Sequence, residues 1–277
     1  MIRFTSENAS PVVVAETKGY RIYLDNDSLS ELASGSPARG QRFTDALHAK
    51  ATLLFSRANA IDVSSATAVR AFLDSVGPAW VPLELNPWEV AKREAAGLAG
   101  QAVVSTSFMQ GYFQDRAHDL SQTCRVLDLS SEGFFQLGAA VDWVHQQRDK
   151  IRAKAAQIDD ALRGRLAALR ADYERDPTSL DQALPPCQFN EQCPATFVLR
   201  HLQRVLIHEA KAYHFKSGDG LDLCHAALAA AYGSLITLDK HWKRRVLALP
   251  SSEKLARTYY RAEIDELIAM MEALPAR

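Results

Sequence analysis

Four short runs of almost uninterrupted apolar residues recur along the chain, each beside a segment with a helical pattern. They are "GYRIYLD" (19–25), "ATLLF" (51–55), "WVPLEL" (80–85) and "SLITL" (234–238). Strands buried on both faces have this composition, because helices cover both sides of a parallel sheet. Pro82 places the third run at an edge of the sheet, since proline lacks the N–H that a central strand donates. The alternation predicts an α/β fold in which helices flank a parallel sheet.

Residues that start and stop helices stand between these runs. Ser56 is a good N-cap for the helix expected after the second run, and Gly35 is expected to end the helix after the first. The segment "SPARG" (36–40) is expected to be a loop. On these signals we predict helices at 26–35, 41–50, 57–77, 86–97, 221–233 and 240–249, and a final amphipathic helix at 251–274.

The character of the chain changes in its middle. From Val141 to Tyr173 apolar residues recur at seven-residue spacing, which predicts one long amphipathic helix, or two if Gly164 breaks it. A Pro-rich connection and another helix, at 195–215, follow. We therefore predict an α/β core made of residues 1–98 and 196–277, interrupted by a helical insertion at 99–195.

The apolar stripe of the long helix must be buried, since leaving its Leu and Ile side chains in water would forgo about 1.5–3 kcal/mol each. The segments around 106–118 and 197–215 are themselves amphipathic and flank the insertion. We expect them to cover the stripe, in preference to a second copy of the chain or a partner protein.

Composition and charge narrow the class of protein only slightly. The 277 residues are 47% apolar and 23% charged with a net charge of −1, so a nucleic-acid partner would have to bind a local basic patch. No apolar run has the length of a signal peptide or a membrane span, so we expect a cytoplasmic protein without a membrane partner. The four cysteines, of which Cys224 lies among small core-type residues, are expected to be free thiols: Cys124, Cys187, Cys193 and Cys224.

Acidic residues follow the predicted strands. Asp25 ends the first strand, and Asp239 follows the last strand. Asp62 lies on the helix after the second strand, and Asp222 opens the helix that precedes the last strand. Each has an ordinary structural explanation, as a helix cap or, for Asp62, as surface charge. The carboxyl ends of parallel strands meet at one edge of a sheet, however, and carboxylate oxygens are the ligands that Mg²⁺ and Mn²⁺ prefer. Four acids in this pattern favour a divalent-metal site.

Three stretches resemble the motifs of the PIN-domain nucleases: "YLDNDSLSEL", "LLFSRANAIDV" and "GDGLDLCHAALAAAYGSLITLDKHW". The resemblance covers roughly residues 20–95 and 197–247. It implies that Asp25, Asp62, Asp222 and Asp239 are the catalytic, metal-binding acids, with Mg²⁺ or Mn²⁺ as the cofactor. It also implies endonucleolytic cleavage of RNA that leaves a 5′-phosphate and a 3′-hydroxyl.

The chain departs from the family's pattern in three respects. The second acid is commonly Glu in the family and is Asp62 here. The residue after the first acid commonly carries a hydroxyl and is Asn26 here, so the next residue, Asp27, either joins the site or replaces a partner. The helical insertion has no counterpart in the compact members of the family. We expect it to select the RNA or the partner protein and to contribute nothing to the chemical step.

Contacts with the substrate are expected from the cations directly behind the last acid. Lys240, Lys243 and Arg244 would neutralise phosphates, while Trp242 either packs in the core or stacks on a base. Two alternatives stay open: a metal-dependent DNA nuclease, and a catalytically inactive PIN-like interaction protein. Within the ribonuclease interpretation, a toxin or defence component restrained by an antitoxin or regulatory protein is an attractive role, and a homodimer stays open.

Overall fold

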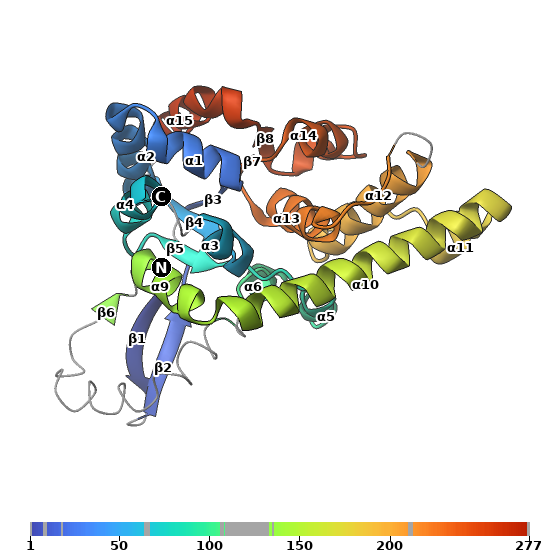
Figure 1. The fold of residues 1–277 in the computed structure, drawn as a ribbon, viewed down its shortest axis with the longest axis horizontal. Coiled ribbons are helices and arrows are strands. Elements are labelled where there is room, and N and C mark those ends of the chain that lie inside the picture. The colour runs from blue at the N-terminus through green and yellow to red at the C-terminus, as the bar shows by residue number, and fades with distance from the viewer. Residues whose placement is uncertain are drawn as a thin grey trace. The chain divides into compact units, whose positions relative to one another are not determined.

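The computed structural model describes residues 2–7, 10–17, 19–63, 67–105, 108, 133–134, 136–209 and 213–275. The chain divides into two compact units, and we describe each by itself (Figure 1). The first unit contains residues 1–83, 104–148 and 261–277. The second contains residues 84–103 and 149–260.

The central sheet has five strands in the order β5-β4-β3-β7-β8. They are β3 (Tyr20–Tyr23), β4 (Ala51–Phe55), β5 (Trp80–Pro82), β7 (Leu235–Thr237) and β8 (Arg257–Tyr259). The ladders β3–β4, β4–β5 and β7–β8 are parallel, so the predicted α/β fold with a parallel sheet is confirmed. Every residue of β4 is buried, and β5 lies at an edge of the sheet, as Pro82 indicated.

The helices of the first unit are α1 (Asn26–Ser34), α2 (Pro37–Lys50), α3 (Arg57–Val63), α4 (Thr67–Val76), α9 (Leu137–Gln146) and α15 (Ile264–Ala273). Helix α2 packs against α15, as Figure 1 shows, and two exposed ion pairs, Arg39–Asp265 and Arg42–Glu272, join them. The predicted loop at 36–40 is wrong, because α2 already begins at Pro37. Proline suits this position, since the first N–H groups of a helix have no partner in the helix.

A small antiparallel sheet also belongs to the first unit. Its strands are β1 (Ile2–Glu7), β2 (Ser10–Ala15) and β6 (Gly133–Phe134), in the order β2-β1-β6. No helix or strand was predicted at these residues. Of the segment around 106–118, the structure describes only Phe108, so the helix expected there stays a prediction.

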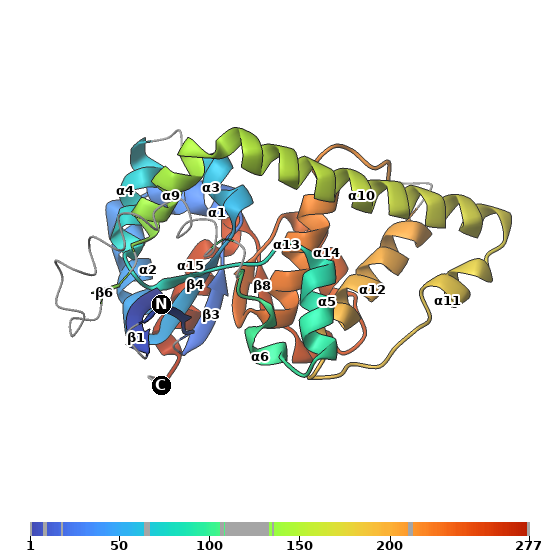
Figure 2. The ribbon, with the colours of Figure 1, turned by 90° about the horizontal axis from the view of Figure 1, so that it is seen from below.

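The second unit is a group of helices beside β7 and β8. Its helices are α5 (Pro87–Ala95), α6 (Ala99–Ala102), α10 (Arg148–Arg175), α11 (Ser179–Ala183), α12 (Pro194–His208), α13 (Asp219–Tyr232) and α14 (Lys240–Leu247). Helix α12 packs against both α13 and α5, and α10 runs across this group (Figure 2).

The long amphipathic segment is interrupted at Gln147 and continues through Gly164. Helix α9 ends at Gln146 and α10 begins at Arg148. Gly164 is exposed, and its replacement by a larger residue would meet nothing within 4 Å. A glycine in an exposed helix lowers the stability of the helix by only about 1 kcal/mol relative to alanine. The packing of α10 offsets this loss.

Part of the apolar stripe of α10 is covered by the second unit itself. Leu169 and Tyr173 pack against a buried cluster of Leu180, Leu184 and Ile207, which come from α11, its C-terminal boundary and α12. The expectation that the helix at 197–215 covers the stripe is therefore confirmed for this part of it, through Ile207. That helix is shorter than predicted, because α12 ends at His208.

The predicted single helix at 251–274 is wrong. A short 3₁₀ turn, η1 (Ser252–Lys254), leads into strand β8, and a second turn, η2 (Arg261–Glu263), leads into α15. Thr258 and Tyr259 are buried in β8, where branched and aromatic side chains suit a strand. Among the described residues, no helix is both long and apolar enough to cross a membrane.

Candidate active site

Asp25 lies at the carboxyl end of β3 and caps helix α1. Its Oδ1 accepts a hydrogen bond of 3.0 Å from the backbone N–H of Ser28. The carboxylate is partly exposed. The helix-cap interpretation of this acid is thus confirmed.

Asp62 is held by the residue that directly follows Asp25. Asn26 donates from Nδ2 to Asp62 Oδ2 at 2.9 Å, and its own Oδ1 accepts from Asn59 Nδ2 at 2.7 Å. Asp62 is exposed on α3, whereas Asn59 is buried one turn earlier. The structure therefore joins the start of α1 to α3, at the carboxyl ends of the neighbouring strands β3 and β4.

Ser56 and Asn59 form the buried base of this chain of hydrogen bonds. Ser56 Oγ donates to Asn59 Oδ1 at 2.7 Å, and the backbone N–H of Asn59 donates back to Ser56 Oγ at 3.0 Å. The prediction that Ser56 caps α3 is confirmed. Asn59 was not among the predicted site residues, although a Ser-x-x-Asn spacing immediately after a buried strand indicates this pair of contacts.

Asp27 points to a different partner. Its side chain is 72% exposed, and its Oδ2 lies 4.0 Å from Nη1 of Arg261. Asn26, and not Asp27, makes the contact with Asp62.

Asp239 follows β7 and caps helix α14. Its Oδ1 accepts hydrogen bonds from the backbone N–H groups of His241, at 2.7 Å, and Trp242, at 2.8 Å. The carboxylate is exposed. Trp242 is only 4% exposed and lies beneath the guanidinium of Arg245, so it packs in the core, and its burial contradicts the alternative of stacking on a base.

Asp222 is exposed in the first turn of α13. This helix begins at Asp219, two residues before the predicted start, so a second acid shares its first turn. The backbone N–H of Asp222 donates to the carbonyl of Gly218 at 2.9 Å. Helices α13 and α14 contact each other, which places Asp222 and Asp239 on adjacent helices of one unit.

The cations expected to bind phosphate lie on the same helix as the cap Asp239. Lys240 is exposed, and Arg244 is 69% exposed with its Nη2 3.7 Å from Glu209 Oε1. Lys243 Nζ lies 5.3 Å from the centroid of the Tyr260 ring. The structure therefore places these cations beside Asp239, on the first two turns of α14.

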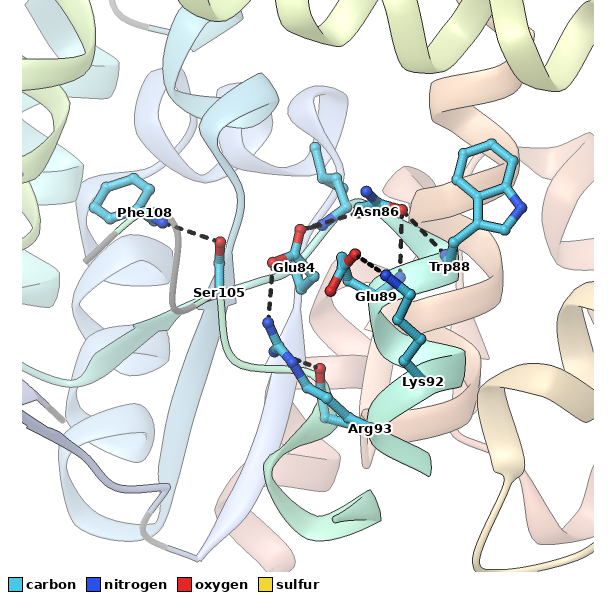
Figure 3. A network of polar contacts seen from close by, with 10 residues as sticks. Glu84, Asn86, Trp88, Glu89, Lys92, Arg93, Ser105 and Phe108 are labelled. Carbon is cyan, nitrogen blue, oxygen red and sulfur yellow. Dashed lines mark hydrogen bonds and ion pairs between the residues drawn. The ribbon is translucent and has the colours of Figure 1, made fainter. Parts of the chain in front are cut away.

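Another acid near the end of a strand is buried and bound by its own neighbours. Glu84, two residues after β5, is 7% exposed and accepts hydrogen bonds of 3.0 Å from the backbone N–H groups of Leu85 and Asn86 (Figure 3). Its other oxygen lies 3.7 Å from Arg93 Nη2. Asn86 in turn caps α5. A buried, internally bonded carboxylate of this kind differs from the four exposed or partly exposed acids.

The cysteines offer no competing metal site in the part of the chain that the structure describes. Cys187, Cys193 and Cys224 are free thiols, as predicted, and Cys124 lies outside the described residues. Cys187 Sγ lies 3.9 Å from His201 Nε2, and the same nitrogen lies 3.0 Å from the carbonyl oxygen of Cys187, but among the described residues no third His, Cys, Asp or Glu joins this pair in a metal-binding group. Burial raises the pKa of the Cys224 thiol, which therefore stays protonated in the core.

The four acids fit a divalent metal by their chemistry, since carboxylate oxygens are the usual ligands of Mg²⁺ and Mn²⁺. Asp25 and Asp62 belong to the first unit, and Asp222 and Asp239 belong to the second. Within the described ranges, no group of three or more His, Cys, Asp or Glu side chains is arranged to hold a metal ion.

Comparison with protein-family models, with curated proteins and with solved structures found no match for this chain. Membership of the PIN-domain family therefore stays a prediction from the three motifs.

Proposed function

We propose that this protein is a divalent-metal-dependent endoribonuclease of the PIN type, in which Asp25, Asp62, Asp222 and Asp239 bind Mg²⁺ or Mn²⁺. The observation that carries the proposal is the chain of hydrogen bonds from buried Ser56 through Asn59 and Asn26 to exposed Asp62. A surface carboxylate that serves only solubility needs no buried support. Support of this kind is typical of metal sites, where outer residues orient the ligands.

Different residues are proposed to bind the metal, to orient a metal ligand and to bind the RNA. When bound, the metal supplies an activated water and stabilises the charge that develops on phosphate during in-line displacement. The acids hold the metal, and Asn26 fixes the orientation of Asp62. Lys240, Lys243 and Arg244 bind the phosphates of the RNA strand. A side-chain nucleophile is not needed for such a displacement.

The central experiment compares Asp25→Asn and Asp239→Asn with the wild type in cleavage of a short unstructured RNA with Mn²⁺. Both variants should lose cleavage and remain folded, because Asn is as good an N-cap as Asp and preserves the start of each helix. EDTA should abolish the activity of the wild type, and added Mn²⁺ should restore it.

Asp27→Asn is the matched control, since it removes the same charge two residues after Asp25 from a side chain that faces Arg261. It should retain cleavage. If either Asp25→Asn or Asp239→Asn cuts RNA as well as the wild type, with contaminating nuclease excluded, these acids are not the metal ligands.

Matched RNA and DNA strands of one sequence test the choice of substrate, because phosphodiester chemistry alone does not distinguish the sugars. Preferential cleavage of DNA would replace the ribonuclease proposal by the DNA-nuclease alternative. A folded wild-type protein that fails to bind Mn²⁺ would instead support a non-catalytic interaction protein. A role as a toxin under the control of an antitoxin stays a prediction. A partner protein encoded beside this chain would support it.

A further inference from the structure

A buried carboxylate on the long helix contacts the start of α13, the helix that carries Asp222. Asp159 of α10 is 3% exposed. It accepts hydrogen bonds from the backbone N–H groups of Gly218 at 3.0 Å, Gly220 at 2.8 Å and Leu221 at 3.3 Å. Its Oδ2 also lies 2.8 Å from Nε of Arg163, one turn further along α10. The donors at the start of α13 are thus bound by a charged group from another helix, where the dipole of α13 also favours negative charge.

The contact is close enough to require glycine. A Cβ atom at Gly220 would lie 2.8 Å from the carbonyl oxygen of Asp159 and 2.9 Å from its Oδ1. Gly218 has φ of +97°, a backbone conformation that other residues rarely adopt. The carbonyl of Gly218 accepts the hydrogen bond from the N–H of Asp222. Asp159 therefore holds the residue that in turn fixes the backbone of Asp222.

A second contact from α10 binds the segment that precedes α13. Arg170 donates from Nη1 to the carbonyl of Tyr213 at 2.8 Å. Burial, together with a hydrogen bond to Asp219, raises the pKa of Tyr213 well above its usual range, so its hydroxyl stays protonated. The guanidinium of Arg245, on the helix that Asp239 caps, lies 4.4 Å from the Tyr213 ring centroid. Tyr213, in the segment before α13, thus contacts both α10 and α14.

We propose that Asp159 is a positioning residue for the metal site, through which the helical insertion sets the position of Asp222. This inference rests on the proposed function, because it takes Asp222 to be a metal ligand. It replaces the expectation that the insertion contributes nothing to the chemical step. Residues that orient metal ligands typically change metal affinity by about 10-fold to 100-fold when they are mutated.

The test is the affinity of the full-length protein for Mn²⁺, measured by electron paramagnetic resonance without RNA. Asp159→Asn keeps the size of the side chain but loses its charge and turns an amide N–H₂ group toward backbone donors. Its Kd for Mn²⁺ should rise by about 10-fold or more. Hydrogen exchange of the amides at 218–222 should become faster. Cleavage should recover at high Mn²⁺ concentration, because the ligands themselves are intact.

Glu94→Gln is the matched control. Glu94 is 2% exposed in the same unit and accepts hydrogen bonds from the N–H groups of Ala195, at 2.7 Å, and Thr196, at 3.0 Å, at the start of α12. It also accepts from the hydroxyl of Tyr232, at the other end of α13 from Asp222. This variant should lower the stability of the unit in the same way and leave the Kd for Mn²⁺ unchanged.

Should Asp159→Asn fail to fold, Asp159→Glu keeps the charge but displaces the loop by one methylene, and it should also weaken Mn²⁺ binding. Affinity equal to the wild type in the folded Asp159 variant overturns the positioning role alone. An equal loss in Glu94→Gln also overturns it, because the effect would then be general destabilisation. A wild-type protein that binds no Mn²⁺ overturns the proposed function and this inference with it.

Discussion

A carboxylate that caps a helix still has a second oxygen, so capping and metal binding are compatible roles for one residue. Asp239 accepts both of its cap hydrogen bonds on Oδ1. Asp25 likewise accepts from Ser28 on Oδ1. The cap fixes the side-chain rotamer, and a fixed rotamer lowers the entropy that a ligand loses when it binds metal. The cap role of these two acids is therefore compatible with their proposed function.

Asn26 provides a prediction at the scale of a single residue. Asn26→Ala removes the donor to Asp62 and leaves the amide of the buried Asn59 without its acceptor. We expect weaker Mn²⁺ binding and a loss of about 1–3 kcal/mol in the free energy of unfolding. Titration with Mn²⁺ and denaturation by urea measure the two effects.

Asp27→Ala is the neighbouring control for that variant, since Asp27 is exposed and 4.0 Å from Arg261. Exposed pairs contribute about 0–1 kcal/mol, so both quantities should stay near their wild-type values. Unchanged Mn²⁺ affinity in Asn26→Ala would show that the contact with Asp62 is unrelated to metal binding.

At the scale of elements, α10 is a long helix whose buried face is partly polar. Its buried residues are Ile151, Asp159, Leu162 and Leu166. The aliphatic members pack, whereas Asp159 makes directed hydrogen bonds to the start of α13. A helix used only to cover apolar surface would have no need for a buried acid, because burying a charge is costly unless it is paired.

Two glycines test this description of α10. Gly164→Ala should raise the free energy of unfolding by about 0.5–1 kcal/mol, because the site is exposed and helical and alanine loses less entropy on folding. Gly220→Ala should lower it, because the added methyl group would overlap Asp159. Urea denaturation measures both. Destabilisation by Gly164→Ala would mean that α10 is not continuous at this position.

At the scale of the whole molecule, a net charge of −1 gives no general attraction to RNA, so binding depends on local cations. Lys240→Ala combined with Lys243→Ala, in the Asp25→Asn background to prevent cleavage, should reduce the salt dependence of RNA binding. Two lost phosphate contacts lower the slope of log K against log salt by about 1.4 for a single strand.

Lys92→Ala combined with Lys254→Ala, in the same Asp25→Asn background, is the control, because both lysines are exposed, lie outside α10 and α14, and give the same change of charge. Its slope should match that of Asp25→Asn alone. Fluorescence anisotropy over a series of salt concentrations distinguishes the two pairs. Equal slopes in both double variants would remove α14 as the phosphate-binding helix.

Deletion of the insertion is a poor test of its role. A deletion of residues 141–195 would remove Asp159 from the start of α13 and Ala195 from the carboxylate of Glu94. It would therefore disturb the loop before Asp222 together with any surface that selects RNA. Point variants on α10 separate these two roles.

The sequence by itself determined the features that depend on near neighbours. The strands β3, β4, β5 and β7 were predicted because buried parallel strands are apolar throughout, which the local composition records. The caps by Ser56, Asn86 and Asp239 were predictable because a cap bonds to N–H groups two or three residues away. The α/β class follows from the order of these elements alone.

Only the tertiary structure decided the features that depend on distant partners. Strand β8 was predicted as helix, since its conformation comes from pairing with β7, in which Ile236 lies opposite Thr258. Asn26 and Asn59 are 33 residues apart, and Asp159 and Gly220 are 61 residues apart. No local periodicity records such contacts, because folding brings together side chains whose separation along the chain is arbitrary. The residues that support the proposed metal ligands therefore became visible only in the folded chain.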